Sequence, residues 1–375
     1  MMKKKTLNIL LSIEIISCQG KFYLKRAKFF LELAKHFDVT LHSRIVYREE
    51  VCDQYYELHS LNVSPLEESL RLKPSYVKRI NGLRSQNELI FVLFPVRSLD
   101  FFLVRTLCRY PKLIVWVKAN TIEYKLSFLK RYSFSRFLFP PSYLFFSSLY
   151  SIFMGILLKK SLVFYTGDIT FSRRNHMRQY SMVSSTLERD EISFKPKTSI
   201  QRKKILYVGN ISFEKGVFDL LEAVKDLPDY TLTVVGNGIA LDQCKKMYDK
   251  YSNIFFTGAQ YNRSKLLEIY DQNGILVMPS HSEKQGKVYL EAMARGLVPI
   301  VTDVGGVHTI IKNMYNGLMV KSASPKDLRD SLLELSSHKK LFDSLQKNGQ
   351  RTIVECTFEK QINFMKEVIL NTFFK

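Results

Sequence analysis

The amino-acid sequence predicts an α/β protein in which two Rossmann-like, doubly wound domains lie in tandem and face a central cleft. Its length of 375 residues is enough for two domains that each bury a core. Short apolar runs alternate with helical patterns along the chain, which is typical of parallel sheets covered by helices. A basic, polar stretch near the middle has no apolar period, and the alternation restarts after it. We therefore expect a linker there, with one domain on either side.

The first domain is expected over residues 1–186. Its start, MMKKKTLNILLSIEIISCQG, has the basic region and apolar run of a secretory signal, but Glu14 interrupts the run. We therefore predict a buried first strand from Leu7 to Ile16, a loop at Cys18-Gln19-Gly20 and then a helix over Leu24 to His36. The further strands predicted in this domain are Val39 to Ser43, Leu89 to Phe94, Leu113 to Val117 and Leu162 to Tyr165.

The second domain is expected over residues 205–356, after a linker at residues 187–204. Its predicted strands are Lys204 to Val208, Thr231 to Val235, Ile254 to Thr257, Ile275 to Met278 and Val298 to Val301. Its predicted helices are Gly216 to Leu227, Ala240 to Tyr251, Ser264 to Asp271 and Gly286 to Arg295. Residues 357–375 have apolar side chains on one face and are expected to form a separate C-terminal helix.

Two glutamates, Glu283 and Glu291, stand eight residues apart at the last of these strand-to-helix turns. Helical side chains tilt toward the N-terminus, so Glu291 leans back toward the loop that carries Glu283. Both carboxylates can therefore line one pocket at the carboxyl end of a strand, where open α/β sheets bind ligands. The amides of Gly286 to Val288, at the helix start, favour phosphate. Two acids for hydroxyl groups beside an anion site indicate a sugar nucleotide.

Two further turns follow strands of the second domain. The segment Gly209 to Gly216, GNISFEKG, leads from a strand into a helix, and Gly209 lets the backbone turn tightly. Lys215 stands at the start of that helix, where its ammonium can join backbone amides around a diphosphate. Gly236-Asn237-Gly238 ends the next strand. Each turn alone has an ordinary structural explanation, and only their placement at the carboxyl ends of successive strands indicates a shared site.

Together these segments resemble the retaining GT-B glycosyltransferases of family 4, the group 1 glycosyl transferases. The resemblance covers residues 205–320 well and the first domain only in outline. It is carried by LYVGNISFEKGVFDLLEAV, LTVVGNG, FFTGAQ, GILVMPS, the E-x7-E stretch and NGLMV. It implies a GT-B architecture in which the C-terminal helix, residues 357–375, packs back on the acceptor-binding first domain.

The resemblance also implies a role for each matching residue. Glu291 would hold the ribose hydroxyls of the donor, whereas Glu283 and Lys215 would be the catalytic pair, on the transferred sugar and on the diphosphate. Gly258 would belong to the loop that holds the base. The donor-binding residues expected in this way are Glu291, Gly209, Asn210, Gly236, Gly258, Gly286, Lys287 and Val288.

Some positions depart from the family pattern. Asn210 stands where the family usually has an arginine directed at the diphosphate, and such a charged hydrogen bond contributes roughly 1.5–3 kcal/mol. Lys287 is close enough in sequence to the phosphate-binding amides to substitute for it. Gly20 is what is left of an N-terminal glycine-rich loop, and Lys118 lies near a position where members keep a histidine. We regard Gly20 and Lys118 as candidate acceptor-side residues.

The implied activity is transfer of a sugar from a nucleotide-sugar donor to a saccharide or lipid-linked acceptor, with retention of anomeric configuration. The resemblance implies a metal-independent hexosyl- or glycosyltransferase without a cofactor, and the sequence, which has no D-x-D motif, agrees with this. Lysine and helix dipoles would stabilise the leaving diphosphate. The departing phosphate would take the proton of the acceptor hydroxyl, and Glu283 would position the sugar rather than attack it.

Charge is unevenly distributed over the chain, whose net charge is +21. Residues 89–187 contain fourteen Lys or Arg and three acidic residues, and such a field attracts polyanions or anionic lipid. Within this region, residues 137–158 carry no charge. They would form a helix lying in the bilayer interface, a buried helix of the first domain or a membrane span. Five scattered cysteines without CxxC spacing indicate a reducing compartment and no zinc site.

We therefore expect a cytoplasmic, bacterial enzyme that is peripheral on the inner face of the cell membrane. Its basic first domain would meet the anionic membrane surface, and its pathway would be surface polysaccharide or lipooligosaccharide biosynthesis. A sugar-nucleotide epimerase of the same fold is the alternative enzyme. A nucleic-acid-binding protein is the alternative of another class, but the sequence contains no base-reading module, and we expect no nucleic-acid partner.

Overall fold

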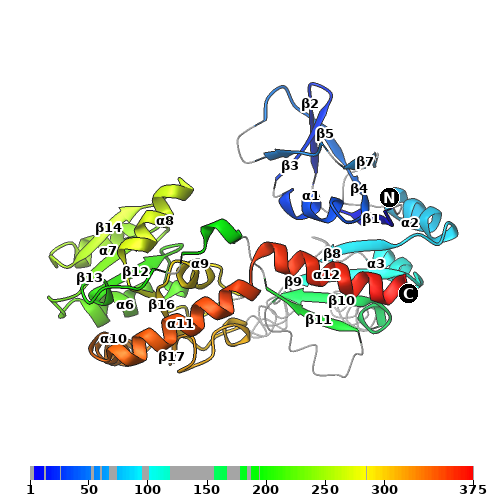
Figure 1. Ribbon diagram of the computed structural model, residues 1–375. Helices are drawn as coiled ribbons and strands as arrows, with labels where there is room; N and C mark the ends of the chain where they lie inside the picture. Colours follow the sequence, from blue (N-terminus) through cyan, green and yellow to red (C-terminus); the bar gives the residue numbers. More distant parts are fainter. Residues whose placement is uncertain are drawn as a thin grey trace, which may run out of the picture. The chain divides into compact units, whose positions relative to one another are not determined.

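The computed structural model divides the chain into two compact units, shown in Figure 1. Unit 1 is Met1–Met182 with Ile362–Lys375, and unit 2 is Val183–Gln361. The structure describes residues 4–11, 14–25, 27–51, 55–59, 61–66, 74–94, 101–118, 156–166, 178–183, 187–193, 195–283 and 285–374. Each unit is built on a parallel sheet with helices, so the prediction of two Rossmann-like α/β domains is confirmed.

The main sheet of unit 1 has seven strands in the order β11-β10-β9-β8-β1-β4-β7, all parallel. Its described helices are α1 (Lys28–Ala34), α2 (Pro74–Ser85) and α3 (Phe101–Cys108). The strands are β1 (Thr6–Leu10), β4 (Asp38–Ser43), β7 (Asn62–Pro65), β8 (Ile90–Phe94), β9 (Leu113–Lys118), β10 (Leu162–Thr166) and β11 (Gln179–Met182).

The predicted first strand, Leu7 to Ile16, is wrong in its length. β1 ends at Leu10, and a second strand, β2 (Ile15–Cys18), belongs to a separate small sheet of order β5-β2-β3-β6. β2 forms an antiparallel hairpin with β3 (Lys21–Lys25) through a turn in which Gln19 has φ 48° and Gly20 has φ 77°. Two residues with positive φ make the turn type that matches strand twist. The remaining strands of this sheet are β5 (Ile45–Tyr47) and β6 (Tyr55–Glu57).

The hairpin also corrects the first predicted helix. It was expected from Leu24 but begins at Lys28, because Leu24 pairs with Tyr56 inside the small sheet. Of the uncharged stretch at residues 137–158, only 156–158 lie among the described residues, in a helix at 156–160. Among the helices that the structure describes, none combines the length and apolarity needed to cross a bilayer.

The sheet of unit 2 has six parallel strands in the order β14-β13-β12-β15-β16-β17. The five predicted strands all occur, within one residue at either end. The strands are β12 (Lys204–Val208), β13 (Thr231–Val235), β14 (Ile254–Gly258), β15 (Ile275–Met278), β16 (Val298–Thr302) and β17 (Leu318–Val320). The helices are α6 (Val217–Val224), α7 (Leu241–Tyr248), α8 (Arg263–Gln272), α9 (Val288–Ala294), α10 (Pro325–Ser337) and α11 (Lys339–Glu355).

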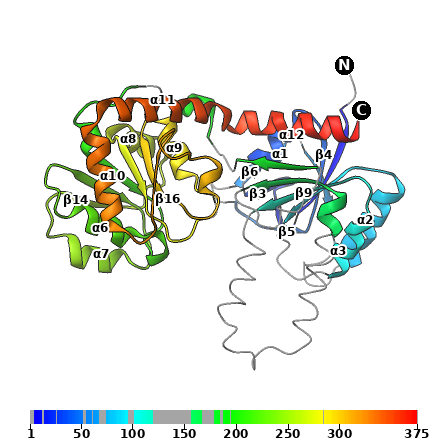
Figure 2. The same ribbon diagram turned by 90° about the horizontal axis from the view of Figure 1, so that it is seen from below.

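Helices cover both faces of this sheet (Figure 2). Side chains alternate along a strand, and in β12 Ile205 and Tyr207 pack into one core while Leu206 packs into the other. The first core holds residues of α6, α7 and α10, and the second holds residues of α8 and α9. Buried apolar residues on both faces fix the strands and therefore fix where their carboxyl ends, and the loops that follow, must lie.

The segment predicted as a linker, residues 187–204, contains short regular elements. It contains 3₁₀ turns at Arg189–Glu191 and Gln201–Lys203. The last helix, α12 (Phe358–Phe373), begins in unit 2, where Phe358 donates its N–H to the Leu187 carbonyl. From Ile362 onward it belongs to unit 1, where the ring of Phe364 lies 5.9 Å from that of Tyr180.

Candidate functional site

Three loops join at the carboxyl edge of the unit 2 sheet. After β12, Gly209 donates its N–H to Val235 at 3.0 Å, which ties this loop to the end of β13. After β15, the N–H of His281 bonds to the Glu214 carbonyl at 2.9 Å. Gly216 lets these segments approach, because its φ is 63° and a β-carbon there would lie only 1.9 Å from the Pro279 oxygen. The loops predicted to share a site therefore do lie against one another.

The two predicted catalytic side chains form an ion pair. Lys215 ends the 3₁₀ turn before α6, and its ammonium lies 2.8 Å from Oε2 of Glu283 in the loop after β15. The exposed fractions of the two side chains are 29% for Lys215 and 15% for Glu283. A charged pair that is largely withdrawn from water is screened less than a fully exposed pair, so its attraction is stronger. The structure thus brings together two residues that are 68 positions apart in the sequence.

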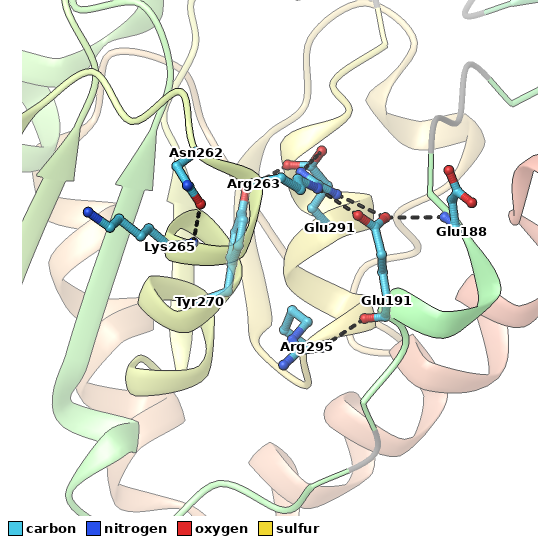
Figure 3. A network of polar contacts seen from close by, with 8 residues as sticks. All are labelled: Glu188, Glu191, Asn262, Arg263, Lys265, Tyr270, Glu291 and Arg295. Atoms are coloured by element: carbon cyan, nitrogen blue, oxygen red, sulfur yellow. Dashed lines mark hydrogen bonds and ion pairs between the residues drawn. The ribbon is translucent and has the colours of Figure 1, made fainter. Parts of the chain in front are cut away.

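Glu291 lies in the first turn of α9, and both of its carboxylate oxygens are bonded (Figure 3). Oε1 accepts from Arg263 Nη1 at 2.8 Å, and Oε2 accepts from the Tyr270 hydroxyl at 3.0 Å. Arg263 and Tyr270 are seven residues apart on α8, which is about two turns, so they share one helix face. Asn262 caps this helix by accepting the Lys265 N–H and so fixes the turn that carries Arg263.

Arg263 is also bonded to Glu191, on the 3₁₀ turn that precedes the sheet in sequence. Its Nε and Nη2 donate to the two Glu191 oxygens at 2.6 and 3.0 Å. This paired geometry is specific to the guanidinium group. The Glu191 bonds raise the pKa of Arg263, and burial with the nearby Glu291 raises the pKa of Tyr270 well above its usual value. Both groups therefore stay protonated donors at neutral pH.

Sequence reasoning missed Arg263, Tyr270 and Glu191. Glu291 is 28 residues from Arg263 and 21 from Tyr270, and Arg263 is 72 residues from Glu191, so no local spacing connects them. One signal was present in the sequence. Arg263 follows an N-cap asparagine in the loop after Gly258, which places it at the same carboxyl edge.

The remaining predicted donor-side residues also lie on the loops of this edge. The Asn210 carbonyl accepts the Tyr207 hydroxyl at 2.8 Å, and its side chain is exposed. Gly236 donates its N–H to the Gly258 carbonyl at 2.9 Å. Gly286, Lys287 and Val288 lie at the start of α9, which begins at Val288 rather than at the predicted Gly286.

Gly286 is closely packed within this edge. A β-carbon there would lie 2.7 Å from the Met278 methyl and 2.8 Å from the Tyr289 ring. The absence of a side chain at Gly286 therefore lets the loop after β15 lie directly on the core.

The two candidate acceptor-side residues belong to unit 1 and lie in different sheets. Gly20 is in the hairpin turn of the small sheet, which explains its positive φ without any ligand. Lys118 ends β9 of the main sheet and stands opposite Thr166 of β10. In the part of the chain that the structure describes, no three His, Cys, Asp or Glu side chains are grouped so that they could hold a metal ion.

Comparison with known proteins shows similarity to glycosyltransferases, mainly in the second half of the chain. Residues 188–352 match the family model described as Glycosyl transferases group 1. An uncharacterized glycosyltransferase of Methanocaldococcus jannaschii is 32% identical over 172 residues, which are 44% of this chain and 46% of that protein. N,N'-diacetylbacillosaminyl-diphospho-undecaprenol alpha-1,3-N-acetylgalactosaminyltransferase of Campylobacter jejuni is 25% identical over 241 residues. That match covers 64% of this chain and 61% of the relative, so the chain spans less than two thirds of either protein.

Solved structures match over almost the whole chain. The Anabaena protein Alr3699/HepE in complex with UDP has a TM-score of 0.63 at 13% identity, over 98% of this chain and 100% of that one. At this identity the likeness concerns the fold, which is the two-domain architecture of GT-B glycosyltransferases. Residues 188–352 are therefore similar to the Glycosyl transferases group 1 family, and the chain has the GT-B fold.

Proposed function

We propose that the protein is a glycosyltransferase that takes its sugar from a nucleotide-sugar donor bound at the carboxyl edge of the unit 2 sheet. The observation that carries the proposal is the placement of two acids and a lysine on the loops and the helix start at one edge of the sheet. Glu283 is paired with Lys215, and Glu291 is held on a separate helix with one hydrogen bond to each oxygen. This arrangement offers carboxylates for hydroxyl groups and an ammonium for phosphate. The UDP bound to Alr3699/HepE supports the same class of ligand.

In this proposal each residue has one task. Glu291 accepts hydrogen bonds from the ribose, Glu283 positions the transferred sugar, and Lys215 leaves Glu283 to bind the donor diphosphate. The glycines that pack the loops together, with the amides of Gly286 to Val288, allow the phosphates to approach the backbone. Asn210 contributes a neutral group where an arginine would contribute charge. Gly20 and Lys118 remain candidates for the acceptor side.

We infer that the reaction proceeds with retention and without a metal ion. The acceptor hydroxyl attacks the anomeric carbon from the face of the departing diphosphate, whose oxygen takes the hydroxyl proton. Lys215 stabilises the negative charge that develops on this leaving group. Glu283 forms no bond to the sugar, so a glycosyl adduct trapped on Glu283 would exclude this mechanism.

We propose a saccharide or lipid-linked acceptor, in the synthesis of a surface polysaccharide or lipooligosaccharide at the inner face of the membrane. The support is the basic composition of residues 89–187 and the name of the Campylobacter relative, which specifies an undecaprenol diphosphate acceptor. Each Lys or Arg close to an anionic membrane contributes about 1 kcal/mol of attraction. In a flotation assay, the full chain should therefore rise with vesicles that contain anionic lipid. With vesicles of neutral lipid it should stay in the bottom fraction.

The decisive experiment is a transfer assay with UDP-, GDP-, ADP- and CMP-sugars. Undecaprenyl-diphosphate-linked saccharides serve as acceptors, and products are identified by mass spectrometry and NMR. The proposal predicts a glycosylated product with the anomeric configuration of the donor, formed equally well with EDTA present. Release of a rearranged sugar without an acceptor would identify an epimerase instead.

A further inference from the structure

The carboxylate of Glu291 is held by the protein through one hydrogen bond to each of its oxygens. Arg263 and Tyr270 each donate to a different oxygen, at 2.8 and 3.0 Å. A carboxylate oxygen has two acceptor positions, so one position on each oxygen remains. The exposed fraction of the Glu291 side chain is 13%, so most of it is covered by protein while part of it stays accessible. Two hydroxyl groups, one donating to each oxygen, have the chemistry to use this pair of acceptor positions.

The direction of the Glu291 carboxylate depends on Arg263, and the direction of Arg263 depends on Glu191. Glu191 takes two of the guanidinium donors, Nε and Nη2, and leaves Nη1 pointing at Glu291 (Figure 3). The exposed fraction of the Glu191 side chain is 15%, and that of Arg263 is 39%. A planar guanidinium held at two of its nitrogens cannot rotate, so its third nitrogen has a fixed position.

Glu191 is itself held by its surroundings. One of its oxygens accepts the Glu188 N–H at 3.2 Å, and its backbone carbonyl accepts from Arg295 Nη1 at 3.0 Å. Arg295 follows the last residue of α9 and also bonds to Asp271 of α8. The segment that carries Glu191 is therefore tied to both helices that contribute to the Glu291 pocket, and the whole set forms one connected network.

We propose that Arg263, oriented by Glu191, is a positioning residue that aims the Glu291 carboxylate at two vicinal hydroxyl groups and thereby sets the preference for a ribose-containing nucleotide. This inference rests on the proposed function, because it assumes that Glu291 meets the donor. Arg263 acts through Glu291 and touches no reacting atom. Removal of the Arg263 side chain should therefore weaken the binding only of ligands that carry the two hydroxyl groups. It should do so only while Glu291 is present.

The test uses calorimetric titration of the full chain with UDP, ADP and GDP, each beside its 2′,3′-dideoxy counterpart. The variants are Arg263→Met, Arg263→Lys, Glu191→Gln, Glu291→Gln and the double variant Arg263→Met/Glu291→Gln. Arg329→Met is the matched control, because Arg329 has a similar exposed fraction, 38%, and also faces a carboxylate, that of Asp226. Circular dichroism checks that each variant is folded.

The wild type should bind at least one ribonucleotide and prefer it to the dideoxy form. Arg263→Met should weaken binding of the ribonucleotide by about 10-fold and binding of the dideoxy form by less than about two-fold, since Glu291 loses the one charged hydrogen bond that orients it. Glu191→Gln and Arg263→Lys should give smaller losses in the same direction. The double variant should bind no more weakly than Glu291→Gln, within about two-fold, because residues in one network are not additive.

Two results would overturn the inference while the proposed function stands. In the first, Arg263→Met weakens both forms equally, which means a general structural role. In the second, Arg263→Met binds like the wild type although Glu291→Gln loses the ribose preference. Absence of any binding to the wild type would instead overturn the donor site itself, and this inference with it.

Discussion

Replacing Lys215 with methionine should separate the contribution of the Lys215–Glu283 pair to stability from the contribution of Lys215 to donor binding. The ammonium and carboxylate lie 2.8 Å apart. At an effective dielectric constant of about 20 their direct attraction is about 6 kcal/mol, most of which desolvation offsets. Because both side chains retain some contact with water, we expect Lys215→Met to lower the free energy of unfolding by only about 1–2 kcal/mol. Methionine keeps most of the apolar stem, so the loss is electrostatic.

A second substitution, Glu283→Gln, removes the negative charge that loses its ammonium partner in Lys215→Met. The double variant should therefore regain at least half of the lost unfolding free energy, measured by urea denaturation. Donor binding should not recover, because the diphosphate has still lost its ammonium. Each single charged hydrogen bond contributes roughly 1.5–3 kcal/mol, so nucleoside diphosphate affinity should stay about 10- to 100-fold below the wild type.

The assay is calorimetric titration with the nucleoside diphosphate that the wild type binds most tightly. Recovery of affinity together with stability in the double variant would refute the reasoning, because Lys215 would then be only a counter-ion for Glu283. Equal stability of all three proteins would refute the claim that the pair is more than a surface contact.

Three further predictions concern other parts of the fold. Burial lowers the pKa of His42 to about 4 from its ordinary 6.5, so protonation opposes folding and stability should fall as pH drops from about 6.5 to about 4, by at most about 3 kcal/mol. His42→Gln, which can still donate to Asn8, should remove this slope in urea unfolding measured at pH 7.5 and 5; an unchanged slope would contradict it. Gly216→Ala should cost at least about 2 kcal/mol in thermal unfolding, whereas Gly258→Ala, with positive φ but open space, should cost about 1; equal costs would show that the Pro279 contact does not matter. Asn210→Arg should strengthen nucleoside diphosphate binding by about 10-fold, and weaker binding would place Asn210 away from the phosphates.

Strands that are buried on both faces of a sheet could be located from the sequence, because each one is a short continuous run of apolar residues. β12 and β15 lie where the apolar segments Lys204 to Val208 and Ile275 to Met278 predicted them. The small sheet of unit 1 could not be located in this way. The turn at Gln19-Gly20 was predicted as a loop, but the break between β1, which ends at Leu10, and β2, which begins at Ile15, was not. The residues between them, LSIE, contain no Gly or Pro, so Leu7 to Ile16 read as one strand.

In the candidate site, the placement of residues could be predicted from the sequence, but their pairing could not. The sequence order of strand, loop and helix indicated that Glu283, Glu291 and Lys215 belong to one edge of a sheet. It could not indicate which charges pair, because pairing depends on side-chain directions across different loops. Arg263 and Glu191 are the clearest example, since a guanidinium between two carboxylates is visible only once α8 and α9 are packed together.

The most direct test of a donor site built on Glu283, Glu291 and Lys215 is calorimetric titration of the wild type and of Glu291→Ala with UDP-, GDP-, ADP- and CMP-sugars. The wild type should bind one of these donors, and Glu291→Ala should bind the same donor at least about 10-fold more weakly. Binding of that donor with equal affinity by both proteins, or of none by the wild type, would contradict the assignment of this edge of the sheet as the donor site.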